Sequence, residues 1–513
     1  MIFRIHYCVI GPKFILLPYN NHYNNMNTTR MLKAWLIATM ALVAAACSHN
    51  QSEILDTIPA ESGFIARINA ENLLESAGFS RNGDEWEAGK VVDALLSELS
   101  SKDRLEIEQA LNMTKAIDAG NVFLFSYEND SYLTCLVKYP DELAAALEAE
   151  FGVPERSNSF KVYDEHIMLR DNRLWIADDT RKLTNVLDAA ASKPATSSKS
   201  IMATFAAENT AIDISLNPSM LFASNPYARA MGIDIKALAQ SHISYRATLD
   251  KNKLKIVATT FDETGDKMAI GDLMTPIDAS FIKFMPGKPD AAFAFGKVSD
   301  ELISQVLGDV PSMQRNLVEP YFKAVNGTFA IAASMPEELN RFTAPAAWSF
   351  TLAVGYDESK AGELLRMAAG LNGNGVTVRQ LADQLCVTFN GSGMPNIFIA
   401  YKEGYLVAST QPVSSTNDGL DARHFNKYFA AGILSVPADG KFGKAVQLPF
   451  GVKSRMECDD EEMNSITEFE GSPYGFIESI ISLATDRALQ RRIIEAVAAT
   501  SGEGDAADYT EWE

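Results

Sequence analysis

The chain has few of the residues that most often perform enzyme chemistry. Its 513 residues include six histidines and five cysteines, and no two cysteines have the CxxC spacing of zinc, iron–sulfur or redox sites. The signatures of nucleotide-binding loops, HExxH metalloproteases and GxSxG hydrolases are also missing. We therefore expect no cofactor and no metal, and no motif supports a catalytic residue.

Positive charge is also scarce. The chain has 45 Lys and Arg against 66 Asp and Glu, a net charge of −21. Four of the basic residues, and none of the acidic ones, lie in the first 46 residues, which leaves 41 against 66, or −25, in the rest. Because such a body is repelled by phosphate backbones, nucleic acid is not expected as a partner. Solubility by itself explains the acidity.

No apolar run approaches the roughly 20 residues that a membrane-spanning helix needs. The apolar run 34–43 follows Arg30 and Lys33 and precedes three alanines and Cys47. A basic start, a short apolar stretch and small residues are typical of a signal peptide. We expect cleavage between Ala46 and Cys47 and a diacylglycerol on the Cys47 thiol.

This segment is similar to the lipobox of bacterial lipoproteins, although Ala44 stands where leucine is commonest. The alternative is an ordinary secretory signal followed by a chance cysteine. Because each buried CH2 contributes about 0.8 kcal/mol, two or three acyl chains such as palmitate would anchor the chain stably. Residues 1–25 do not fit a signal peptide, and we expect translation to start at Met26 or Met31.

The rest of the chain predicts an α+β fold of mostly antiparallel sheet with flanking helices. Its length exceeds what one hydrophobic core normally serves. Five groups of elements recur in the same order, which favours two tandem copies of one unit, although any α+β chain gives some coincidences. The recurring segments are 58–74 and 285–307, 119–125 and 326–333, 132–142 and 349–358, 166–177 and 397–408, and 205–207 and 429–431.

These patterns predict a division of the chain into successive parts. The predicted parts are a signal peptide 1–46, a lipidated tether 47–57, a first α+β domain 58–275, a second 276–470, a C-terminal docking helix 471–500 and an acidic tail 501–513. The helix is predicted from Ser472-Pro473, an N-cap followed by proline, and from the apolar side chains that follow at helical spacing.

Candidate sites each have a simpler structural interpretation. Asp164 and His166 would share one face of a strand, but two ligands are too few for catalytic zinc, so a surface histidine is favoured. His424, beside Asp421 and Arg423, is typical of a helix start. The acidic run 458–462 lacks the spaced ligands and glycine of a calcium loop and is interpreted as solvated.

Other residues are interpreted as parts of the fold. The glycine-rich run 370–375 follows a helix, where a phosphate loop should follow a strand, and is interpreted as a helix end and turn. Trp175, Trp348 and Tyr405 lie in strand patterns and are expected in the core rather than on a sugar-binding surface. Cys135 and Cys386 lie in strand-like runs and are expected to be buried free thiols.

The features used for comparison with a known family are Cys47, Ile58-Pro59-Ala60, residues 64–69 and the pair Leu73-Leu74. In these features the chain resembles Bacteroidetes-type lipoproteins with a domain of unknown function. The resemblance covers most of the mature chain loosely and implies no catalytic residues. In similar envelopes, an acidic run after the cysteine directs lipoproteins to the cell surface. Residues 48–51 contain no acid, which favours the periplasmic face of the outer membrane.

The sequence therefore predicts a membrane-attached envelope protein that binds another envelope protein or a glycan, or acts as a scaffold. One alternative is an envelope hydrolase of peptide or glycan, which requires two carboxyl groups about 5–10 Å apart in a cleft. Another alternative is a solute-binding lipoprotein.

Overall fold

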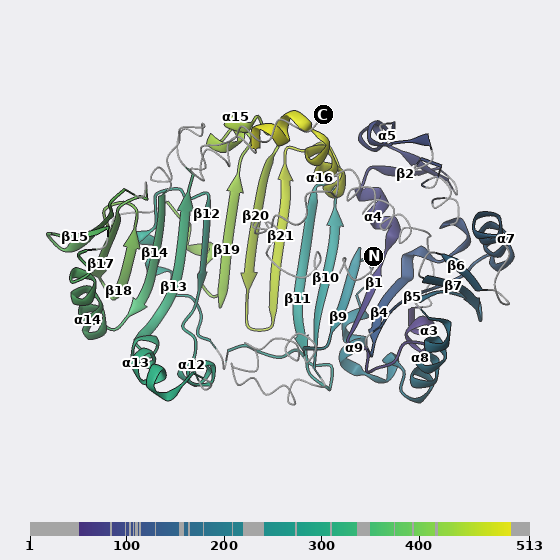
Figure 1. Cartoon of the computed structure of the whole chain (residues 1–513), viewed down its shortest axis with the longest axis horizontal. Helices are drawn as coiled ribbons and strands as arrows, with labels where there is room; N and C mark the ends of the chain where they lie inside the picture. Colours follow the sequence, from purple (N-terminus) through teal and green to yellow (C-terminus); the bar gives the residue numbers. More distant parts are fainter. Residues whose placement is uncertain are drawn as a thin grey trace. The chain divides into compact units, whose positions relative to one another are not determined.

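The computed structural model describes residues 51–493 except for 153–158, 219–240, 336–348 and gaps of one to three residues. The chain divides into two compact units. Unit 1 comprises the residues up to Glu75 and Phe79–Leu216, and unit 2 comprises Ser76–Gly78 and the residues from Asn217 onward. Every described strand pairing within each unit is antiparallel, and helices are interspersed with the strands, so the predicted α+β class is confirmed (Figure 1).

The sheet of unit 1 is organised around β1, Phe64–Ile68, all five residues of which are buried. β1 pairs along its whole length with β4 on one side and β9 on the other. Beyond β4 the order continues through β5, β8 and β7 to β6. The other strands are β4 Val122–Tyr127, β5 Asp130–Leu136, β6 Ser159–Val162, β7 Glu165–Arg170, β8 Arg173–Ala177 and β9 Ile212–Leu216, with a separate pair β2 Phe79–Asn82 and β3 Glu85–Ala88.

An aromatic cluster forms the centre of the core of unit 1. Phe125 stacks on Tyr132 with ring centroids 5.3 Å apart, and Trp175 meets Phe125 edge-on at 6.5 Å. Trp175 is 1% exposed, as expected for a core residue. Other strand residues, among them Ile65 and Phe123, and apolar residues of the helices complete this core. The helices of this part of the chain are α3 Gln51–Leu55, α4 Ala70–Ser76, α5 Lys90–Ser97, α7 Pro140–Phe151, α8 Thr180–Ser192 and α9 Lys199–Phe205.

A buried ion pair joins β1 to β9. The side chain of Arg67 is 9% exposed and that of Asp213 is fully buried. Arg67 donates from Nε to Asp213 at 2.9 Å and from Nη2 to Thr210 at 2.8 Å and to the Ala207 carbonyl at 2.9 Å. Another guanidinium nitrogen donates to Gln51 in α3. The pair is embedded in further hydrogen bonds, as a buried charge requires.

Unit 2 contains a longer sheet, in the order β10-β11-β21-β20-β19-β12-β13-β14-β18-β17-β16-β15 (Figure 1). Its strands are β10 His242–Asp250, β11 Lys253–Phe261, β12 Ala291–Phe295, β13 Val325–Ser334, β14 Ser349–Tyr356, β15 Val376–Leu381, β16 Gln384–Phe389, β17 Ile397–Lys402, β18 Tyr405–Ser409, β19 Ala430–Val436, β20 Gly451–Cys458 and β21 Glu462–Glu470.

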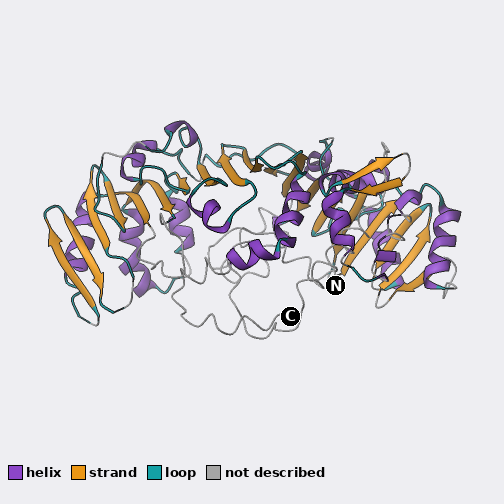
Figure 2. Cartoon of the chain, turned by 90° about the horizontal axis from the view of Figure 1, so that it is seen from above, coloured by secondary structure: helices purple, strands orange, loops and turns teal. Residues whose placement is uncertain are grey.

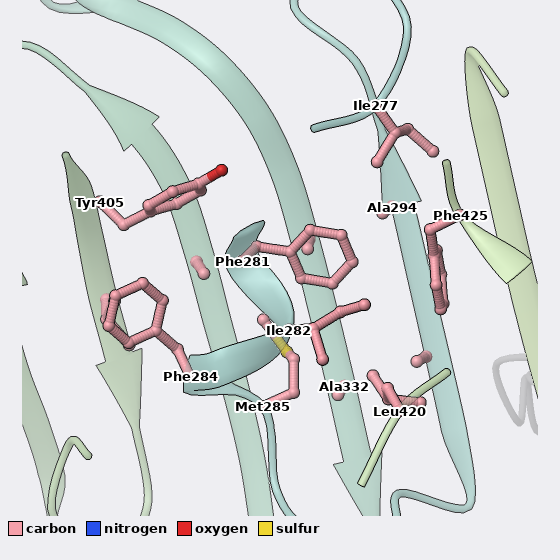
Figure 3. Packing of buried hydrophobic residues seen from close by; sticks show 14 of the residues in the cluster. Ile277, Phe281, Ile282, Phe284, Met285, Ala294, Ala332, Tyr405, Leu420 and Phe425 are labelled. Atoms are coloured by element: carbon pink, nitrogen blue, oxygen red, sulfur yellow. The ribbon is translucent and has the colours of Figure 1, made fainter. Parts of the chain in front are cut away.

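One face of this sheet, over β12, β13, β14, β17 and β19, consists largely of small buried residues. Ala294 and Ala332 lie there, and the short helix η4, Ala279–Phe284, packs over them (Figure 3). Phe281 from η4 meets Phe425 edge-on at 5.4 Å, and both rings are almost fully buried. The alanine side chains therefore let the aromatic rings approach the strands closely.

The helices of unit 2 lie beside the sheet and at the ends of its strands, not between them (Figure 1 and Figure 2). α14, Glu358–Ala369, follows its N-cap Asp357, whose carboxylate accepts hydrogen bonds from the amides of Ser359 and Lys360. Its residue Ala361 packs with Tyr356 of β14 and with Leu406 of β18. The other helices are α12 Asp300–Val306, α13 Ser312–Lys323, α15 Lys441–Val446 and α16 Phe476–Thr485.

The predicted C-terminal docking helix is interrupted in the structure. α16 begins at Phe476 with Gly475 as its N-cap and ends at Thr485 because Asp486 is extended, and helical structure resumes at 487–493. Ser472 is not the cap, because its hydroxyl bonds to the Ser479 hydroxyl and accepts from the Tyr474 amide. Phe476 docks on Phe469 of β21 at 5.0 Å.

Candidate functional site

The predicted lipidation site, Ala46 and Cys47, lies outside the described residues, as do the signal peptide, the acidic tail, Trp348 and Asp164. His166 lies in β7, opposite Lys161 and Ala177. The predicted pair of Asp164 and His166 therefore includes one residue, Asp164, that lies outside the described part of the chain. Among the residues that the structure describes, no group of three or more His, Cys, Asp or Glu side chains is arranged to hold a metal ion.

The cluster near His424 is a helix start. Asp421 caps η6, Ala422–His424, by accepting from the Arg423 amide. Its carboxylate also accepts from the Arg423 guanidinium at 2.6 Å. These side-chain hydrogen bonds lower the pKa of Asp421 to about 2. The carboxylate stays ionised near neutral pH, and its partners are part of the fold.

The acidic run 458–462 bonds to the protein itself. Asp459 accepts from the amides of Glu461 and Glu462 in the turn between β20 and β21. Asp460 accepts from the Gly271 amide at 2.7 Å, and Glu462 pairs with Lys267 at 2.8 Å. These oxygens hold neighbouring segments together.

In the glycine-rich run, Gly370 is the C-cap of α14, and Gly373 and Gly375 have positive φ in the turn that follows.

The thiols of the described part of the chain are free, and Cys135 and Cys386 are buried as predicted. Burial raises the pKa of Cys135, which is fully enclosed in β5. Burial and then the Asp459 carboxylate raise the pKa of Cys458, which is only partly buried.

We expect the native thiols to differ strongly in alkylation rate. Because the thiolate is the nucleophile, iodoacetamide should modify Cys458 first and Cys135 only after unfolding. A time course in native buffer and in urea, read by mass spectrometry of the peptides, measures both rates. Equal rates in native buffer would contradict the burial of Cys135.

The most distinctive surface of unit 2 is one that sequence reasoning missed. Side chains that are paired across neighbouring strands point to the same side of a sheet. One such row crosses eight strands from β10 to β14, and we call the side that carries it the uncharged face. The row consists of Ala247, Ile256, Ser465, Met456, Gly432, Phe293, Ile331 and Leu352.

Along these eight described strands, no residue of the uncharged face is Asp, Glu, Lys, Arg or His. The opposite face of β10, β11, β20 and β21 is charged. Lys253 lies directly opposite Glu468 and pairs with it at 3.3 Å, and Arg455 pairs with Glu457 at 3.3 Å. The alternation of lysine with leucine and isoleucine in 253–256 is the period-2 signal that could have revealed this face.

The uncharged face contains a hollow of about 320 Å³ over β12, β13, β19 and β20. Its lining is apolar except for Ser454, whose hydroxyl is already bonded to Thr467 at 3.0 Å. Ile331 at its border is 42% exposed. A Cβ atom on Gly432 would lie 3.1 Å from the Phe293 ring, so glycine preserves the space there. We call this feature the hollow.

The hollow lies in the interior of the sheet and not at its edge. β12 is paired with β13 and β19 over all five of its residues, and β19 is also paired with β20. The backbone groups of the floor are therefore engaged in the sheet, and the hollow offers a ligand hydrocarbon contacts only. This arrangement can bind an apolar group, but it holds no acid, base or nucleophile for catalysis.

No protein family, curated protein or solved structure matches the chain. The resemblance to lipoproteins therefore stays a prediction. None of the described helices combines the length and hydropathy needed to cross a bilayer.

Proposed function

We propose that this chain is a lipid-anchored protein of the cell envelope that acts by binding rather than by catalysis. Lipid on Cys47 would hold it at the outer membrane, facing the periplasm. The observation that carries the binding role is the uncharged face of unit 2 with its hollow, an apolar and partly exposed surface on a strongly acidic chain. Exposed apolar patches of this kind mark interaction sites in soluble domains.

The hydrolase alternative finds no support at the hollow. Glycosidase chemistry needs two carboxyl groups facing one cleft. The residues that line the hollow include no carboxylate. The carboxylates of the described acidic run bind amides and lysine instead, which leaves them in structural roles.

We also infer that the chain contains two copies of one folding unit. The order β9-β1-β4-β5-β8-β7-β6 of unit 1 corresponds to β19-β12-β13-β14-β18-β17-β16 of unit 2. β1 and β12 are each five residues long and are paired on both sides throughout. A hairpin follows each copy, β10-β11 after β9 and β20-β21 after β19.

The turns support the same correspondence. Asp171 and Asn172 connect β7 to β8, and both have positive φ. Glu403 and Gly404 connect β17 to β18 at the corresponding place, and both also have positive φ. Two-residue turns of this kind match the twist of a hairpin. Because β11 pairs with β21, the hairpins that follow the two copies lie side by side.

Metabolic labelling tests the anchor. Cells that grow on radiolabelled palmitate should incorporate label into the wild-type chain, and a Cys47→Ala variant should lose it because the acceptor thiol is gone. Cys458→Ala is the matched control and should keep the label, since Cys458 is the last residue of β20 in unit 2. A wild-type chain without label, or equal label in the Cys47→Ala chain, would overturn the anchor.

A further inference from the structure

We propose that the hollow binds one hydrocarbon chain of a separate lipid molecule. The first support is the chemistry of its lining. Phe293, Ile331, Leu434 and Met456 offer apolar contacts, and the hydroxyl of Ser454 is already bonded within the sheet. The polar groups of a ligand would find no hydrogen-bond partner in the hollow, and the loss of their hydrogen bonds to water would weaken binding. A hydrocarbon chain has no polar group to satisfy.

The position of the hollow within the sheet disfavours an extended peptide as the occupant. An extended peptide needs a free strand edge, and the strands of the floor are paired on both sides.

Charge disfavours a second copy of the chain as the occupant. Each copy has a net charge of −21, and the uncharged face has no cation to offset the repulsion between two copies. A lipid chain is neutral and flexible. Acyl chains are abundant at the membrane to which the protein is anchored, and this last step rests on the proposed function.

Photolabelling of the full chain tests the inference. The probe is palmitic acid with a photoactivatable diazirine group on its chain, added to the purified protein, illuminated, and located by mass spectrometry of the peptides. We expect label on β12, β13, β19 or β20, and loss of that label when unmodified palmitic acid competes. Label spread evenly over the chain, or label that palmitic acid does not displace, would overturn the proposal.

Two variants of the hollow separate specific from general binding. Ile331→Lys places an ammonium group beside the hydrocarbon and should reduce labelling about tenfold or more. Ala333→Phe fills the space without adding charge and should have the same effect, which keeps the test valid if the lysine variant does not fold. The matched control is Leu381→Lys, because Leu381 is 41% exposed, as Ile331 is 42%, and does not line the hollow. Unchanged labelling in both hollow variants would contradict the assignment.

The Cys47→Ala chain distinguishes the two sources of hydrocarbon. We expect the hollow to be labelled equally with and without Cys47. Label that occurs only after Cys47→Ala would mean that the protein's own anchor fills the hollow, and would overturn the assignment to a separate lipid. Failure of metabolic labelling at Cys47 would remove the anchor but not a specific photolabel, so the two proposals fail separately.

Discussion

Replacement of Arg67 by methionine is expected to destabilise unit 1 by about 3–5 kcal/mol. The reason is the position of its partner Asp213, which is fully buried and which accepts from Arg67 and Thr210. Without the guanidinium, a carboxylate would remain in the core with its main positive partner removed. Urea unfolding of the full chain, followed by hydrogen exchange of peptides from β1, β4 and β9, would measure the loss.

Two controls separate the buried charge from a general effect of losing an ion pair. Lys182→Met removes a more exposed ion pair, in which Lys182 Nζ lies 2.7 Å from an Asp130 carboxylate oxygen. This change should lower the free energy of unfolding by about 0–1 kcal/mol. The double variant Arg67→Met with Asp213→Leu removes both charges and should recover much of the lost stability. A small effect of Arg67→Met alone would show that Asp213 is solvated or satisfied by other groups.

Replacement of Phe281 by alanine is expected to destabilise unit 2 by about 3–5 kcal/mol. The Phe281 ring is 1% exposed and fills the space between η4 and Phe425, over strands that carry alanines (Figure 3). Because Ala294 and Ala332 are small and fixed in the sheet, they cannot close the cavity that the missing ring leaves. Hydrogen exchange of peptides from β12 and β13 in increasing urea would report the loss.

Phe322→Ala is the matched control for this prediction. Phe322 belongs to α13 in the same unit and is 51% exposed. Its replacement removes the same atoms but leaves no buried cavity, and should change the free energy of unfolding by about 0.5 kcal/mol or less. Equal losses in the two variants would mean that the region around Phe281 can collapse.

The elements that sequence reasoning predicted correctly depend on neighbours in the chain. The hairpin at Asp171-Asn172 was predictable because a two-residue turn selects residues that tolerate positive φ. The burial of Trp175 and Cys135 followed from their strand-like surroundings. The limits of α16 were not predictable, because Ser472 bonds to Ser479 through a folded loop and does not cap the helix.

Several features of the structure, including the candidate site, depend on residues far apart in the chain. Arg67 was visible in its apolar strand, but its partner Asp213 lies 146 residues away. Lys253 faces Glu468 across the pairing of β11 with β21, and local periodicity cannot select that pairing. The hollow likewise needs β12, β13, β19 and β20 side by side before Gly432 can leave space next to Phe293.

The sequence alone determined the charge of the chain, its scarcity of histidine and cysteine, and the alternation that separates lysine from leucine along single strands. Only the tertiary structure decided which strands are neighbours and so joined the apolar sides of eight strands into one face. The physical reason is that alternation along a strand fixes which residues share a side, whereas hydrogen bonding between distant strands fixes which sides become continuous.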